Sequence, residues 1–223
     1  MKDLVLYHGS RGGISGSIKT ISRERCDFGK GFYMGTNPEQ AISLVSGDQA
    51  PYFYKLSLAL SSVSPFRVAY LNNMDWAYYV LYNREKLENI KGSSFYNKIA
   101  NLGKDKDFIV GPIADDAMNE SMKRFVNNQI TDKAFLESIR AIDYGVQYVA
   151  KTDFACSKIH IIDERELYDS ELDRFGKITE ERRNRGHTIA DEMQKKYLGQ
   201  GRFFAQILED LQKEIDYDIG EER

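Results

Sequence analysis

Short apolar runs, separated by turns rich in glycine and proline, predict a series of strands in the first 165 residues. Leu4–His8 is a short run that stops at Gly9, which indicates a buried strand. Tyr52–Leu60 alternates between apolar and polar positions, as a half-buried strand does. Three later runs predict further strands: Asp107–Pro112, Val146–Lys151 and Lys158–Ile162.

Apolar residues at helical spacing lie between these runs. Thr36–Gln40 has the composition of a helix start, with Asn37 as the N-cap and Pro38 at the first helical position. The other expected helices are Met74–Leu87, one with an apolar face of Met118, Met122, Phe125 and Val126, and one capped by Thr131. Because strands and helices mix without strict βαβ alternation, the pattern predicts an α+β fold rather than a doubly wound parallel sheet.

The pattern changes after Asp163. Residues 164–185 are dense in charge of both signs, and residues 188–215 return to helical spacing. We therefore expect one domain over residues 1–165 and a mostly helical extension over residues 166–223. Two interpretations of the extension stay open: a solvated helical face, or an apolar stripe that docks a partner protein.

Composition narrows the class of protein. The 223 residues are 42% hydrophobic and 29% charged, with a net charge of −3, which argues against a chain-wide grip on nucleic acid. Two cysteines, Cys26 and Cys156, are too few for a disulfide scaffold and favour a reducing compartment. No apolar run approaches the roughly 18 residues of a membrane span, and the first residues leave no room for a signal peptide. We expect a cytoplasmic protein that does not enter a membrane.

Three segments carry candidate chemistry. His8-Gly9-Ser10 ends the first strand, Phe28-Gly-Lys-Gly-Phe-Tyr33 leads into the capped helix, and Gln147 lies on a late strand. Simpler sites are not supported. A Cys26–His8 nucleophile pair lacks an orienting partner, and Gly29-Lys30 lacks the spacing of a phosphate loop. His160 and His187 lack metal-ligand spacing, so we expect no metal.

In their order and composition, these segments resemble the ADP-ribosyltransferase superfamily, in the branch shared by diphtheria-type toxins and poly(ADP-ribose) polymerases. That branch has His-Gly-Ser on one strand and a Phe-Gly-Lys-Gly-aliphatic-Tyr segment on another, followed by a helix. The chain is also similar to small bacterial proteins grouped as a domain of unknown function, with a YHGS start, FGKGFY, a Gly-Pro-Ile-Ala-Asp-Asp element and a late Gln-Tyr strand. The resemblance covers residues 4–162 and implies a split antiparallel β-sheet that binds NAD.

The resemblance also implies roles for single residues. His8 would hydrogen-bond a hydroxyl of the nicotinamide ribose, Gly9 would bind the carboxamide through its backbone, and Tyr33 would stack on the nicotinamide ring. The glycine-rich segment 11–17 would lie along the phosphates, paired with Arg11 or Arg23. The two motifs further assign three residues to the NAD site: Ser10, Phe28 and Gly31.

Gln147 departs from the superfamily, which usually has its catalytic glutamate at this position. A glutamine keeps the hydrogen bond to the ribose but loses the charge that favours the cation-like sugar. Either the negative charge comes from elsewhere, or the protein binds NAD with little turnover. Asp115 and Asp116 are the candidates for that charge, with Asp116 preferred; in the simpler interpretation they are first-turn acids favoured by the helix dipole.

The function that the resemblance implies is mono-ADP-ribosylation of a macromolecule with NAD as co-substrate. The acidic composition favours a protein acceptor over a nucleic acid. A toxin or defence effector of this kind would have a neutralising partner, for which the C-terminal helices offer a docking surface. The alternative is a non-catalytic NAD-binding or interaction module of the same fold.

Overall fold

The computed structural model describes residues 3–45, 51–59, 66–113, 116–141 and 145–221, with the side chains of 116–117 and 214–221 left aside. These residues form two compact units that do not follow chain order. The first unit comprises residues 1–71, 105–113 and 144–181, and the remaining residues form the second. Residues 165 and 166, where we expect the extension to begin, both belong to the last strand of the first unit, and that domain boundary stays a prediction.

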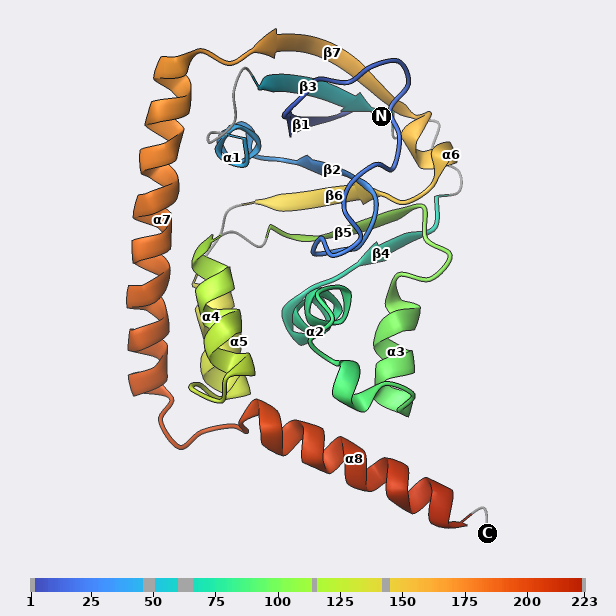
Figure 1. Ribbon diagram of the computed structural model, residues 1–223, viewed down its shortest axis with the longest axis vertical. Helices are drawn as coiled ribbons and strands as arrows, with labels where there is room; N and C mark the ends of the chain where they lie inside the picture. Colours follow the sequence, from blue (N-terminus) through green and yellow to red (C-terminus); the bar gives the residue numbers. More distant parts are fainter. Residues whose placement is uncertain (1–2, 46–50, 60–65, 114–115, 142–144, 222–223) are drawn as a thin grey trace. The chain divides into compact units, whose positions relative to one another are not determined.

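The described strands of the first unit form one seven-stranded sheet in the order β4-β5-β6-β2-β1-β3-β7 (Figure 1). Neighbouring strands are antiparallel except β4 and β5, which are parallel. The strands are β1 (Leu4–Ser10), β2 (Phe32–Gly35), β3 (Tyr52–Leu58), β4 (Val68–Tyr70), β5 (Phe108–Pro112), β6 (Val146–Ala150) and β7 (Ile159–Glu166). A mostly antiparallel sheet with separate helices agrees with the predicted α+β class.

Apolar side chains cover both faces of this sheet, because successive residues of a strand point to opposite faces. One face buries a single cluster that includes Leu6, Phe32, Met34, Tyr54 and Leu56. On the other face, α1 (Pro38–Ser43) and the start of α7 (Asp169–Lys196) pack over Phe53. The alternation predicted for β3 is therefore confirmed.

β7 is longer than the strand predicted over Lys158–Ile162, and that prediction was wrong at its C-terminal end. Glu164 and Glu166 lie directly opposite Tyr54 and Tyr52 of β3. The tyrosine hydroxyls donate to these carboxylates at 3.1 and 2.9 Å. The charged composition of residues 163–166 is typical of a loop. Cross-strand hydrogen bonds of this kind nevertheless stabilise a strand there.

The second unit is helical. Besides the second half of α7, it contains α2 (Asn73–Asn83), the 3-10 helix η2 (Glu88–Ile90), α3 (Ser94–Leu102), α4 (Asp116–Val126), α5 (Asp132–Arg140) and α8 (Phe204–Glu221). Its buried aromatic side chains include Phe125, Phe135 and Phe204. Phe125 stacks on Phe135 with ring centroids 4.8 Å apart and meets Phe204 edge-on at 5.2 Å.

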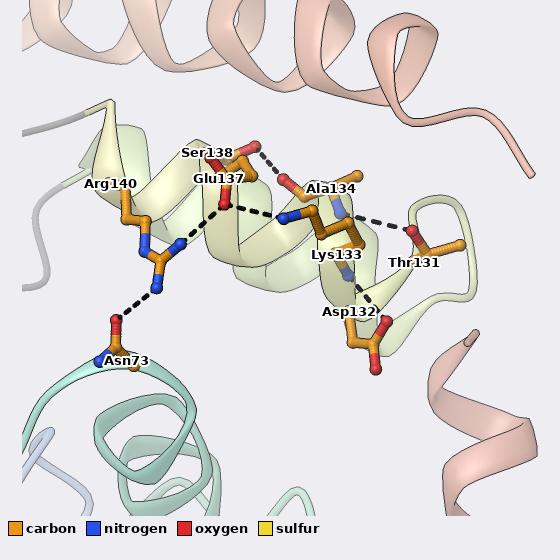
Figure 2. Close-up of polar contacts among 8 residues, drawn as sticks. All are labelled: Asn73, Thr131, Asp132, Lys133, Ala134, Glu137, Ser138 and Arg140. Carbon is orange, nitrogen blue, oxygen red and sulfur yellow. Dashed lines mark hydrogen bonds and ion pairs between the residues drawn. The ribbon is translucent and has the colours of Figure 1, made fainter. Parts of the chain in front are cut away.

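Figure 2 shows the polar contacts of α5 in this unit. The Thr131 hydroxyl accepts a backbone N–H of the first turn at 3.3 Å, which confirms the predicted cap. Farther along the helix, Glu137 pairs with Lys133 at 3.2 Å and with Arg140 at 2.8 Å. Arg140 also donates to Asn73 at 3.3 Å and so ties the end of α5 to the start of α2.

One helix prediction differs from the structure in length. Met74–Leu87 overshoots α2, which ends at Asn83, because Glu85 adopts a φ of 56° that no right-handed helix continues. The tail, expected to be mostly helical from residue 166, contains α7 over Asp169–Lys196 and α8 over Phe204–Glu221, and residues 164–166 of the charge-dense stretch belong to β7. Of the described helices, none combines the length and apolar character needed to cross a membrane.

Candidate functional site

A pocket of about 100 Å³ opens in the first unit where β1, β2 and β6 meet α1. Its walls include Tyr7, His8, Gly9, Tyr33, Leu44 and Gln147. Pockets for drug-sized ligands measure roughly 300–1,000 Å³. A pocket of this size takes one ring-sized group, and a larger ligand has to extend beyond it.

The pocket lies where β1 and β2 part. The two strands pair through Tyr7 and Gly35, whereas β1 continues to pair with β3 as far as Ser10. At this opening the His8 side chain reaches across to β2, with Nδ1 2.7 Å from the carbonyl oxygen of Tyr33. A carbonyl only accepts, so Nδ1 carries the hydrogen and Nε2 is left as an acceptor.

His8 is held in its neutral form. Burial lowers its pKa from 6.5 to about 4, against the smaller opposing effect of the Tyr33 hydrogen bond. Its ring lies 4.5 Å from the Phe32 ring and 6.1 Å from the Tyr54 ring, measured between centroids. A neutral imidazole with a fixed tautomer can accept a hydrogen bond from a ligand hydroxyl at neutral pH.

Packing alone requires glycine at position 9, whether or not a ligand binds there. A Cβ at this position would overlap the carbonyl oxygen of Ala41 in α1. α1 begins as predicted, with the Asn37 side chain accepting the Glu39 N–H at 3.0 Å. The glycine therefore lets this helix lie directly on β1 and close one side of the pocket.

Tyr33 is fixed at both ends of its side chain. Its backbone belongs to β2, and its hydroxyl accepts the Phe28 N–H at 2.9 Å and donates to the Gly29 carbonyl at 2.7 Å. Gly29 has a φ of 69°, which a turn of this kind requires. The Lys151 ammonium donates to the Phe28 carbonyl at 2.5 Å, and burial lowers the pKa of Lys151 to about 8. The Tyr33 ring is therefore a rigid wall of the pocket.

Phe28 and Gly31 support this wall and are not among the described residues that line the pocket. Phe28 is fully buried. A Cβ on Gly31 would overlap the Val149 side chain of β6. Packing within the fold therefore explains Phe28 and Gly31 of the FGKGFY segment. The sequence resemblance assigns both residues to the NAD site.

Gln147 is 7% exposed, and its amide orientation is set by the backbone of β5. Its Nε2 donates to the Pro112 carbonyl oxygen at 2.9 Å, which leaves Oε1 as the acceptor atom. An ionised glutamate has no hydrogen to donate and would oppose the carbonyl with negative charge. The amide at this position therefore suits its surroundings better than the superfamily's carboxylate.

The other expected site residues do not line the pocket, or they are not described by the structure. The Ser10 hydroxyl donates to the Gly13 carbonyl at 3.1 Å and shapes the segment after β1. Arg11 and Arg23 are exposed. Asp116 is the first residue of α4, with its side chain not described, and Asp115 lies outside the described residues. His, Cys, Asp and Glu side chains of the described part of the chain form no cluster of three suited to a metal ion.

Sequence reasoning missed seven residues that line the pocket: Tyr7, Met34, Gly35, Gln40, Ala41, Leu44 and Ile113. Tyr7 stacks on Phe53 with centroids 5.7 Å apart, and Leu44 at the end of α1 is 65% exposed. Tyr7 precedes His8 in the YHGS start, so alternation along β1 could have assigned it to the other face of the sheet. Leu44 depends on the path of α1 over β1, which no local signal contains.

Comparison with known proteins gives one match. A family model described as a protein of unknown function, DUF3990, matches residues 4–161. Neither the curated proteins nor the solved structures contain a match. The matched residues include every residue that lines the pocket. The chain belongs to the DUF3990 family of proteins of unknown function.

Proposed function

We propose that this protein is a mono-ADP-ribosyltransferase that uses NAD to modify a macromolecule, on a split-sheet fold of the ADP-ribosyltransferase type. One observation carries the proposal: His8, Tyr33 and Gln147, from three strands far apart in the sequence, line a single pocket. The sequence resemblance assigns the same three residues to NAD.

The chemistry of each residue supports its role. The unprotonated Nε2 of His8 would accept a hydrogen bond from a ribose hydroxyl, and the Tyr33 ring offers a flat face to the nicotinamide. The free Oε1 of Gln147 would accept from a second ribose hydroxyl. The size of the pocket suits one nicotinamide ring, with the rest of NAD outside it.

The transfer step requires a positioned sugar. The bond between ribose C1′ and the nicotinamide nitrogen breaks, and its electron pair leaves with the nicotinamide. A nucleophilic atom of the acceptor then bonds to C1′ and gives up its proton to solvent. His8 and Gln147 would orient the ribose in this step, because fixed hydrogen bonds lower the barrier most where charge develops.

A second candidate is an NAD-binding module with little turnover. The observation that favours it is the bond between Gln147 and Pro112, together with a described pocket lining that contains no carboxylate. The loss of one electrostatic contact of this kind costs about 3–4 kcal/mol of transition-state stabilisation. In this case NAD stabilises the protein without being consumed.

The acceptor that we propose is a protein, because a net charge of −3 gives no general attraction to nucleic acid. A neutralising partner on α7 and α8 is part of the same proposal. Phe204 and Ile207 of α8 are each 4% exposed and already packed. Such a partner would therefore contact other residues, among them Leu198, which is 80% exposed.

The two functions are separated by incubating the protein and a cell lysate with NAD labelled on its adenylate side. We expect label on a protein band with wild type, a loss of at least about tenfold with His8→Ala and Gln147→Ala, and wild-type labelling with His160→Ala. His160 is an exposed histidine on β7 and serves as the matched control. NAD binding without labelling or nicotinamide release would favour the module, and labelled DNA or RNA would change the acceptor class.

A further inference from the structure

Two parallel rows of side chains cross β1, β3 and β7. In the first row His8 lies opposite Tyr54, which lies opposite Glu164. In the second row Ser10, Tyr52 and Glu166 occupy the corresponding positions. In both rows the tyrosine hydroxyl donates to the carboxylate.

The two rows differ in their contact with the glycine-rich segment 11–17. The Tyr54 hydroxyl accepts the backbone N–H of Ile14 at 2.8 Å. The second row meets the segment through Ser10, whose hydroxyl donates to the Gly13 carbonyl at 3.1 Å, while the Tyr52 hydroxyl donates to Glu166. The Ile14 side chain also packs against the core cluster that contains Tyr54. The tyrosine hydroxyl of the first row therefore fixes the main chain of the segment at Ile14, whereas the second row holds it at Gly13 through Ser10.

Glu164 orients the hydroxyl that makes this bond. Because the Tyr54 hydrogen points to the carboxylate, a lone pair is left for the N–H of Ile14. The Tyr54 side chain is fully buried, and burial is the main reason that its pKa is raised. The hydroxyl thus stays protonated at neutral pH and serves as donor and acceptor together.

The glycines of the segment are not equivalent. Gly13 has a φ of 75°, and a Cβ there would lie 3.3 Å from the Tyr54 hydroxyl. At Gly12 a Cβ would meet no atom within 4 Å. The protein's own packing therefore explains glycine at position 13 but not at position 12, where the missing side chain leaves room for a ligand to approach the backbone.

We propose that Tyr54 is a positioning residue, whose hydroxyl, oriented by Glu164, fixes the main chain at Ile14 and holds the segment 11–17 for the pyrophosphate of NAD. The proposal rests on the proposed function for its ligand. It assigns the anchoring of Ile14 to the Tyr54 hydroxyl of the first row and gives the Tyr52 hydroxyl of the second row no part in it.

Tyr54→Phe and Tyr52→Phe form a matched pair, since each removes one hydroxyl bonded to a glutamate. Two readouts are measured: the rate of tryptic cleavage after Arg11 without NAD, and the NAD dissociation constant by titration calorimetry. We expect Tyr54→Phe to raise both by about tenfold, and Tyr52→Phe to leave both within about twofold of wild type. Unfolding temperatures confirm that both variants are folded.

Glu164 variants provide the rescue. Glu164→Gln keeps an acceptor oxygen for Tyr54 and should stay near wild type, whereas Glu164→Ala should behave like Tyr54→Phe. Wild-type cleavage in folded Tyr54→Phe overturns the proposal, and so does faster cleavage with wild-type NAD affinity. If the wild-type protein binds no NAD, the proposed function fails and this proposal loses its ligand with it. If Tyr54→Phe, but not Tyr52→Phe, is then cleaved faster, the Tyr54 hydroxyl still anchors the segment 11–17, but for a ligand other than NAD.

Discussion

At the scale of single residues, the pocket is built from groups whose protonation and orientation are fixed before any ligand arrives. His8 is neutral with its hydrogen on Nδ1, and the Gln147 amide is turned by the Pro112 carbonyl. Such preorganisation lowers the cost of binding, because few rotamers remain to be ordered.

Gln147→Glu tests the role of the amide. The introduced carboxylate would face the Pro112 carbonyl in a nearly buried position, so we expect a loss of about 1–3 kcal/mol in unfolding free energy at pH 7. This loss should shrink as the pH falls, because protonation restores a donor. Denaturant unfolding of both proteins at pH 7 and pH 5 measures it. Equal stability at pH 7, or a gain in transfer activity, would mean that the pocket accepts a glutamate.

The depressed pKa of His8 predicts a pH dependence of stability. The unfolded chain takes up a proton on this residue below pH 6.5, whereas the folded protein does so only near pH 4. His8 should therefore cost stability as the pH falls from about 6.5 to 4, by at most about 1.4 kcal/mol per pH unit. Urea unfolding at several pH values should show a shallower slope in His8→Gln and an unchanged slope in His160→Gln. Identical slopes in all three proteins contradict the neutral buried state.

At the scale of elements, the site depends on where α1 lies. Gly9→Ala places a methyl group against the Ala41 carbonyl, so either α1 or β1 has to shift. We expect a loss of about 1–3 kcal/mol, the usual cost of overpacking. The unfolding temperature of Gly9→Ala is compared with that of Gly12→Ala, because a Cβ at Gly12 meets no atom within 4 Å. The prediction fails if both variants unfold at the wild-type temperature.

The elements also show what a sequence can and cannot predict. The cap of α1 and the alternation of β3 are local signals, and both are confirmed. The end of β7 is not local, because Glu164 and Glu166 become strand residues only through the tyrosines of β3. β4 has three residues and pairs with β5 from a distant part of the sequence, so no local period marks it.

The same distinction holds for the site. The glycine-rich neighbours of His8 and Tyr33 mark both residues in the sequence, and both line the pocket. Leu44 and the Pro112 carbonyl depend on tertiary packing that the sequence does not display. Phe28 and Gly31 show the converse, since a motif can be held by the fold rather than by a ligand.

At the scale of the whole molecule, the chain divides into a sheet unit that contains the pocket and a helical unit with its own aromatic core. The family match spans residues of both units, and it carries no activity with it. The proposed function therefore depends on whether the pocket binds NAD.

The most direct test is titration of NAD into the purified chain by calorimetry. We predict one NAD bound per chain, an affinity at least about tenfold weaker in His8→Ala, and wild-type affinity in His160→Ala. No binding by the folded wild-type protein, or equal binding by His8→Ala, would contradict it.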